Sequence, residues 1–292
     1  MKLITRILYS VLLLATVGCF NLKKLQQTGY IQPEDFYYEF PFNTYKSLII
    51  VPVKLSDDTP RNFLFDTGAD LTVIQRDTIV GKSLKVTGAS DRTAKFGREV
   101  ITSFQIGDVD FRSLQAINSD LEGLRDKVPN FGGFIGQNVI GKANWRIDYP
   151  NQTLTLSSRD LSDNKFQKIK VDRKEGSPFV TITIDGETYQ AMVDLGASSA
   201  LGIPDESKLA KQLLSKYDLR EEEREVYTIG GVQTVKQQVG TIPLVTLDNY
   251  EMADVEVKIS RTNRIRLGSR FFKDHILYID NINRDYKIKI VD

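Results

Sequence analysis

Residues 62–74 read NFLFDTGADLTVI, an apolar run that enters a turn containing two aspartates and leaves it as a second apolar run. Short runs of aromatic and β-branched residues bounded by Asp and Gly are typical of β-strands joined by a turn. A related stretch, QAMVDLGASS, occupies residues 190–199. In both stretches a strand is expected to lead directly into Asp-x-Gly-Ala, so Asp66 and Asp194 hold equivalent positions.

Both stretches belong to a longer internal repeat. The two aspartates are offset by 128 residues, whereas Phe134-Ile135-Gly136 and Arg266-Leu267-Gly268 are offset by 132. The pairs Ile147-Asp148 and Ile279-Asp280 keep the offset of 132. Because the two offsets differ by only four residues, we infer a tandem duplication in which each half contributes one Asp turn.

The composition leaves carboxylates as the main candidate chemistry. The 292 residues include 39 Lys plus Arg and 38 Asp plus Glu, for a net charge of +1, so no basic field favours nucleic acid. A single cysteine, Cys19, and a single histidine, His275, exclude Cys/His zinc sites and internal disulfides. We therefore expect no metal and no cofactor. A lone histidine is more often structural than catalytic, and Trp145 is expected to serve packing.

The remaining pattern predicts an all-β protein with one short helix. Strand-like runs separated by turn residues occupy 48–53, 62–65, 154–156, 180–184, 255–259 and 286–291. Asp185-Gly186 favours a two-residue hairpin turn, because both central positions need positive φ. A helix over 205–217 is expected after Pro204, with one apolar face formed by Leu209, Leu213, Leu214 and Tyr217. The run REEERE at 220–225 is expected to continue that helix or to form a charged loop.

The stretch LFDTGADLTVI, followed downstream by FIGQN, resembles the retropepsin and pepsin family of aspartic proteases. Asp-Thr-Gly alone is a weak signal, since Asp and Gly are common in turns. The flanking strands, the Gly136 segment and the repeat make the resemblance specific. It implies two tandem lobes, residues 40–160 and 161–292, with the active-site cleft between them and the short helix in the second lobe.

The resemblance implies that Asp66 and Asp194 are the catalytic residues. Two carboxyl groups a few ångströms apart cannot both ionise easily, so one keeps a proton and acts as the acid while the other acts as the base. Gly68 and Gly196 support this pair, because turns without a β-carbon let backbone N–H groups approach the carboxyl groups.

Other residues near the turns have implied roles. Thr67 resembles the residue that sends its hydroxyl across to the other lobe. Leu195 departs from the family, which has Thr or Ser there, so Thr67 is expected to need another partner or a water; an unpaired buried group costs about 1–3 kcal/mol. Asp70 resembles a family residue that forms a hydrogen bond with the substrate backbone. The alternative is that Asp70 is an ordinary polar turn residue. Ser198 and Ser199 are expected to cap the helix near Pro204, with a hydrogen bond to Asp194 as the alternative.

The resemblance to aspartic proteases implies a hairpin that closes over substrate downstream of each Asp turn. In the second half, Ile229, Gly230 and Gly231 resemble the glycine-rich tip of a retroviral flap. The alternative is a surface hairpin that does not contact substrate. In the first half, the flap should fall within Val86 to Val100, with Phe96-Gly97 as its tip.

The N-terminus is typical of an export signal. Lys2 and Arg6 precede an apolar run over 7–17, which is too short to span a bilayer as a helix. The small residues before Cys19 resemble the lipobox of bacterial lipoproteins, although Thr16 stands where Leu is preferred. We expect residues 1–19 to be a signal peptide, Cys19 to be lipidated, and 20–39 to be a tether; ordinary secretion with a leftover thiol is the alternative.

These features predict an exported aspartic endopeptidase in the bacterial cell envelope, lipid-anchored through Cys19. We expect a monomer that acts on a peptide or protein substrate, binds no nucleic acid, and cleaves better at acidic than at neutral pH. A peptide-binding lipoprotein that has lost hydrolysis is the main alternative. A structural envelope protein built on duplicated lobes is a second, and retention of both aspartates argues against it.

Overall fold

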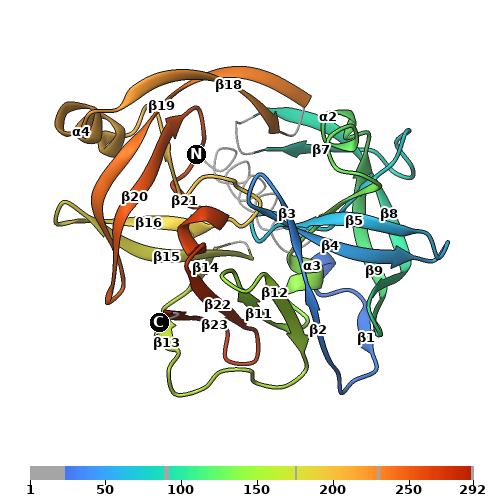
Figure 1. Cartoon of the computed structure of the whole chain (residues 1–292). Helices are drawn as coiled ribbons and strands as arrows, with labels where there is room; N and C mark the ends of the chain where they lie inside the picture. Colours follow the sequence, from blue (N-terminus) through green and yellow to red (C-terminus); the bar gives the residue numbers. More distant parts are fainter. Residues whose placement is uncertain (1–23, 89–91, 175, 229–230, 291–292) are drawn as a thin grey trace, which may run out of the picture.

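The computed structural model describes residues 24–88, 92–174, 176–228 and 231–290, and β-strands dominate it, as the sequence predicted (Figure 1). Each predicted strand run falls within an observed strand, although Val291 lies outside the described residues. In β4 (Leu48–Leu55) the period of two is plain: Val51, Val53 and Leu55 are buried, whereas the residues between them are exposed. Alternation of this kind places one face of a strand in the core.

Within the described chain the strands form three sheets. The nine-stranded sheet contains β1 (Tyr30–Gln32), β9 (Val109–Ser119), β6 (Val73–Gln75), β10 (Phe131–Ile135), β5 (Pro60–Phe65), β4, β8 (Thr93–Ile106) and β7 (Leu84–Thr87), with β3 (Asn43–Tyr45) paired to β4. The eight-stranded sheet contains β14 (Asp172–Lys174), β15 (Ser177–Ile184), β16 (Glu187–Val193), β21 (Arg266–Leu267), β17 (Leu201–Pro204), β20 (Tyr250–Ser260), β19 (Gly231–Leu247) and β18 (Arg220–Thr228). The six-stranded sheet contains β13 (Gln167–Ile169), β23 (Asp285–Ile290), β22 (His275–Asp280), β11 (Asn144–Asp148), β12 (Thr153–Ser157) and β2 (Tyr37–Pro41).

The two larger sheets share one pairing pattern. In the first, β10 lies between β5 and β6, parallel to β5 and antiparallel to β6. In the second, β21 lies between β16 and β17 with the same two senses. The outer pairs also correspond, because β6 runs parallel to β9 and β17 parallel to β20. The sequence repeat is therefore also a repeat of topology.

The six-stranded sheet joins the two halves. Its central pair is β11 from the first half and β22 from the second, which run antiparallel with Trp145 opposite Ile279. Trp145 is fully buried, donates its Nε1–H to the Ile140 carbonyl at 2.9 Å and meets the Phe65 ring edge-on at 5.0 Å. Trp145 thus connects this sheet to the end of β5, where the first Asp turn begins.

The helical part differs from the prediction of one helix. The helix after Pro204 is α4 (Lys208–Lys216), which starts at Ser207, whose Oγ accepts from the Ala210 N–H at 3.0 Å. Leu209, Ala210 and Leu213 are buried, but Leu214 is 44% exposed and does not belong to the apolar face. Short helices α2 (Glu122–Arg125), α3 (Gln137–Ile140) and η1 (Ser269–Phe272) also occur. Each has four residues, too few for a helical period to show in the sequence.

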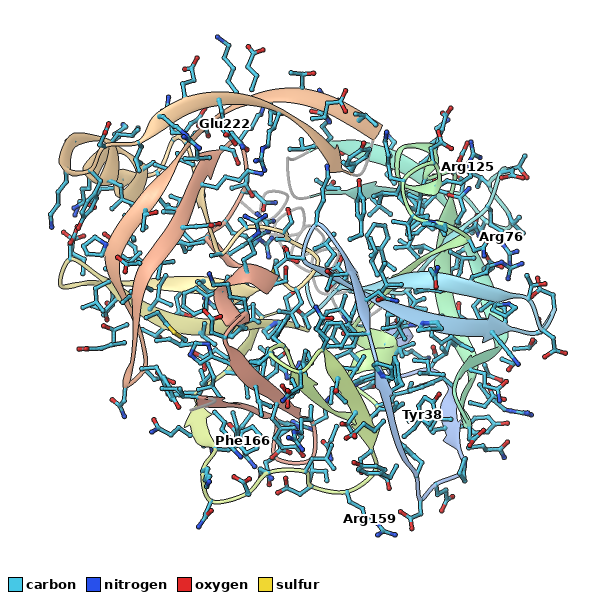
Figure 2. All side chains as sticks on the ribbon, viewed as in Figure 1. Tyr38, Arg76, Arg125, Arg159, Phe166 and Glu222 are labelled. Atoms are coloured by element: carbon cyan, nitrogen blue, oxygen red, sulfur yellow. The ribbon has the colours of Figure 1, made fainter. Side chains whose placement is uncertain are left out.

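The charged run at 220–225 is a strand, so the expectation of a helix continuation or loop was wrong. It begins β18, which pairs antiparallel along its length with β19. This strand lies at the edge of the eight-stranded sheet, where charged side chains can reach solvent. Figure 2 shows Glu222 on this strand; its Oε1 accepts from Gln237 on β19. Asp185 and Gly186 form the predicted hairpin turn between β15 and β16, with φ of 52° and 81°.

The segment expected to be a tether is shorter than residues 20–39. Residues 30–32 form β1, which pairs with β9, and residues 37–41 form β2, which pairs with β12. Edge strands of three to five residues carry too little alternation to be distinguished from a linker. The chain therefore takes part in the sheets from Tyr30 onward.

Candidate active site

The two Asp turns are held by the same backbone contacts in each half. Asp66 follows β5, and its N–H donates to the Ile135 carbonyl at 3.0 Å. Asp194 follows β16, and its N–H donates to the Leu267 carbonyl at 2.9 Å. Each turn therefore rests on the strand that lies beside it in the sheet, β10 or β21.

A second contact in each half closes the turn. The Gln137 N–H donates to the Ala69 carbonyl at 2.8 Å, and the Ser269 N–H donates to the Ala197 carbonyl at 2.9 Å. These four partners keep the offsets of 128 and 132 found in the sequence. These two backbone hydrogen bonds are thus duplicated between the two turns.

The two turns meet face to face. A β-carbon on Gly68 would lie 2.6 Å from Asp194 Oδ1, and a β-carbon on Gly196 would lie 2.3 Å from Asp66 Cγ. Each carboxyl group therefore packs against the glycine of the opposite turn, and the structure brings Asp66, Asp194, Gly68 and Gly196 together as predicted from their resemblance. No other amino acid fits at either glycine without moving a carboxyl group.

Asp66 lies in an environment that favours its protonated form. Its Oδ1 accepts from the N–H groups of Gly68 and Ala69, at 2.8 and 3.1 Å. Although Asp66 keeps partial access to solvent, desolvation raises its pKa well above the usual range, and the neighbouring Asp194 charge raises it further. The two backbone N–H donors lower the pKa but do not outweigh these effects. Asp66 is therefore suited to hold a proton at pH values where an exposed aspartate has lost it.

Asp194 has a different partner, which sequence reasoning missed. The Nε of Arg266 lies 2.9 Å from Asp194 Oδ2, and the two side chains are only 8% and 12% exposed. The Nε–H does not point along this line, so the contact is an ion pair without a well-formed hydrogen bond. A signal existed: Arg266 is a charged residue at the repeat position that holds Phe134 in the first half.

Thr67 has two backbone partners, although Leu195 has no hydroxyl. Its hydroxyl donates to the Val193 carbonyl at 2.7 Å and accepts from the Leu195 N–H at 2.9 Å, both across the contact between the turns. These bonds use backbone groups of the second turn, so the side chain at 195 does not affect them. The offset of 128 residues makes Phe65 and Thr67 the equivalents of Val193 and Leu195. A hydroxyl at position 195 would therefore be expected to face the Phe65 carbonyl and the Thr67 N–H, but the Leu195 side chain has no hydroxyl.

The hairpin of β18 and β19 reaches from the second half to the first. A β-carbon on Gly123, in α2, would lie 2.6 Å from Val232 and 3.0 Å from Tyr227, the residues near the hairpin tip. Lys46 Nζ lies 5.2 Å from the centre of the Tyr227 ring. Gly231 has a φ of +98°, which suits glycine at the tip, while Ile229 and Gly230 lie outside the described residues.

The first-half hairpin has a different tip from the one expected. Strands β7 and β8 pair from Leu84 opposite Phe96 to Thr87 opposite Thr93, so the turn falls after Thr87. Phe96 is 1% exposed and packs with Leu71 and other apolar residues beside the first Asp turn. Phe96-Gly97 is therefore within the strand, because its aromatic ring is needed in the core. Residues 89–91 of this hairpin lie outside the described residues.

Asp70 contacts the N-terminal segment. Gln26 Nε2 donates to the Asp70 carbonyl at 3.2 Å and to Asp70 Oδ1 at 3.4 Å. The neighbouring Leu25 packs on the apolar cluster that contains Leu71 and Phe96. The segment just before β1 thus covers part of the surface next to the first Asp turn, which the sequence did not indicate.

The remaining candidates lie outside the contact between the two Asp turns. Ser207, and neither Ser198 nor Ser199, caps the helix; Ser198 instead accepts at its carbonyl from the Ser47 hydroxyl at 3.2 Å. His275 begins β22 and is partly buried, in keeping with a structural role. In the described ranges, no group of three or more His, Cys, Asp or Glu side chains is placed to hold a metal ion.

Cys19 and the rest of the segment expected to be a signal peptide, residues 1–19, lie outside the described residues. No helix from Lys24 onward, in the part of the chain that the structure describes, is long and apolar enough to cross a membrane. Comparison with models of known protein families and with curated proteins finds no match to this chain.

Gly196→Ala tests the close approach of the two turns. The added β-carbon would lie 2.3 Å from Asp66 Cγ, so the carboxyl group has to move, and overpacking of this kind costs about 1–3 kcal/mol. Thermal unfolding should show a lower midpoint. The control is Gly202→Ala, whose β-carbon would make its nearest contact at 3.5 Å, an ordinary distance. Equal midpoints for the two variants would contradict the geometry.

Thr67→Val tests the hydroxyl that joins the turns. Valine keeps the shape of the side chain but leaves the Val193 carbonyl and the Leu195 N–H without their partner. Denaturant unfolding should show a loss of about 1–3 kcal/mol in the free energy of unfolding. Thr241→Val, at an exposed position in β19, is the control and should change it little. A Thr67→Val protein as stable as wild type would show that these bonds do not hold the turns together.

Proposed function

We propose that the protein is an aspartic endopeptidase in which Asp66 and Asp194 activate a water molecule for peptide hydrolysis. The observation that carries the proposal is that each carboxyl group packs against the glycine of the opposite turn. Two carboxyl groups in mutual contact, one with a strongly raised pKa, are suited to share a single proton.

The chemistry follows from that shared proton. The ionised carboxylate takes a proton from water as the oxygen attacks the peptide carbonyl, and the protonated carboxyl group donates its proton to the carbonyl oxygen. When the C–N bond breaks, the leaving nitrogen receives a proton from the carboxyl group that water protonated. At the same time the other carboxylate takes back a proton from a hydroxyl of the tetrahedral intermediate, so that the carbonyl re-forms. The products are a new carboxylate and a new amine, and the dyad returns to its starting state.

The proposed architecture is a pair of pepsin-like lobes with the cleft between them. Its support is the shared strand order of the two larger sheets and the six-stranded sheet that joins them. The β18–β19 hairpin serves as the flap, because its tip residues Tyr227 and Val232 contact Gly123 of the other half. Closure of such a hairpin over bound peptide would exclude bulk water from the reaction.

The proposed setting is the bacterial cell envelope. Residues 1–19 are a signal peptide, Cys19 carries the lipid anchor, and the substrate is a peptide or protein. The support is the charged and apolar pattern before Cys19. A monomer suffices for this function, because one chain supplies both aspartates.

One observation favours a second candidate, a peptide-binding lipoprotein on the same fold. Arg266 forms a buried ion pair with Asp194, and a carboxylate held by a cation is a weaker base than a free one. In that case the cleft would bind peptides in a manner that does not depend on Asp66. Cleavage assays distinguish the two candidates directly.

The catalytic proposal predicts peptide cleavage without added metal by protein lacking residues 1–19, inhibited by transition-state mimics of the pepstatin type. Asp66→Asn and Asp194→Asn should each reduce turnover by at least ~100-fold, because neither remaining carboxyl group can act as both acid and base. Asp108→Asn, in an exposed turn, should leave it unchanged. Metal-dependent cleavage that survives both dyad substitutions would end the proposal.

The raised pKa of Asp66 gives a separate prediction for stability. A carboxyl group whose folded pKa is raised binds its proton more tightly in the folded state, so its contribution to stability is lost as the pH rises toward the folded pKa. Asp66→Asn removes this titration. Its free energy of unfolding should therefore fall less than that of wild type between pH 4 and pH 7; parallel pH profiles would contradict the raised pKa.

A further inference from the structure

Arg266 is fixed in place by its strand and by its own hydrogen bonds. It lies on β21, opposite Met192 on one side and Gly202 on the other, and the residue is 7% exposed. Its Nη1 donates to Thr262 Oγ1 and to the Arg264 carbonyl, and its Nη2 donates to Asn263 Oδ1 at 2.7 Å. These contacts anchor the far end of the guanidinium and leave Nε beside Asp194.

The first half has no equivalent cation. The repeat position of Arg266 is Phe134, an apolar residue on β10. Asp66 instead receives two backbone N–H groups at Oδ1, whereas Asp194, among the described residues, receives none from its own turn. A duplicated backbone therefore carries two unlike electrostatic environments.

We propose that Arg266 is a positioning residue that divides the two roles within the dyad: it holds Asp194 as the ionised member and leaves the proton on Asp66. This rests on the proposed function for its catalytic meaning, with Asp194 as the base toward water and Asp66 as the acid toward the carbonyl oxygen. The assignment of the negative charge to Asp194 rests only on two observations. Arg266 forms a 2.9 Å ion pair with Asp194, and the equivalent position of the first half holds the apolar Phe134.

The surrounding charges support the assignment. Burial lowers the pKa of Arg266, and Arg264 lowers it further, while Asp194 and Asp66 raise it. A buried cation without a partner is strongly unfavourable, so the ion pair requires the charged form of Asp194. Burial raises the pKa of Asp66 and the neighbouring Asp194 charge raises it further, so the second proton does not leave easily.

Removal of the Arg266 cation should shift the acid-side midpoint of kcat/KM in one direction. The active form needs ionised Asp194 and protonated Asp66, so activity falls on the acid side when Asp194 becomes protonated. An opposite charge within 4–6 Å favours the ionised form of a carboxyl group. Without Arg266, ionisation requires a higher pH, and the acid-side midpoint of kcat/KM should move upward.

The test compares Arg266→Gln and Arg266→Lys with the matched control Arg264→Gln, an exposed arginine two residues away that does not contact the dyad in an ion pair. The pH profile of kcat/KM gives one readout. The second readout is carbon NMR of the carboxyl groups across pH, with Asp66→Asn used to assign the signals. This measurement does not require the protein to cleave peptides. Arg266→Gln should move the lower titration step and the acid-side midpoint upward by about one pH unit or more. Arg266→Lys should restore part of this shift, and Arg264→Gln should leave both where they are in wild type.

Several outcomes separate the two claims. An NMR shift in a protein that cleaves nothing supports the charge assignment and counts against the protease. Cleavage with titrations unmoved by Arg266→Gln overturns the role of Arg266 and leaves the protease in place. If Arg266→Gln does not fold, wild-type NMR still decides: Asp66 should be the member that titrates at the higher pH, and the reverse order overturns the inference.

Discussion

The contact between the two Asp turns is the constraint on which the rest of the structure depends. Each turn needs a glycine because the opposite carboxyl group lies within van der Waals distance of it. To bring the turns this close, each strand that enters a turn is supported by a neighbour, β10 for β5 and β21 for β16. The six-stranded sheet then fixes the two halves relative to one another. The hydroxyl of Thr67 completes the contact from one side.

The duplication is conserved in the backbone contacts that hold the Asp turns, but two side chains of the second half differ from their counterparts. Matched N–H and carbonyl partners hold both turns, yet Leu195 replaces a hydroxyl and Arg266 replaces an apolar residue in the second half. Both departures lie in the same turn region, and they act differently. The Leu195 side chain is fully buried and adds apolar contact, whereas Arg266 adds a charge. The carboxyl groups of Asp66 and Asp194 therefore have unlike surroundings within a repeated pair of turns.

The sequence predicted the features that depend on local pattern. Alternating strands, the Asp185-Gly186 turn and the repeat could all be found, because each leaves a signal within a few residues or at a fixed offset. The strand at 220–228 was missed because its charges suit a solvated helix as well as a sheet edge, and only pairing with β19 decides between them. The Arg266 ion pair joins residues 72 positions apart, and nothing in the local sequence indicates the partner. The comparison of Arg266 with Phe134 across the repeat was the one signal for it.

The central claim is that these two carboxyl groups activate water to hydrolyse peptide bonds. The most direct measurement is to incubate the protein lacking residues 1–19 with a diverse peptide pool in ¹⁸O-labelled water and analyse the products by mass spectrometry. The account predicts internal cleavage, with one ¹⁸O atom in each new C-terminal carboxylate, and no such products from Asp66→Asn. Absence of cleavage across pH, or labelled products that Asp66→Asn forms equally well, would contradict it.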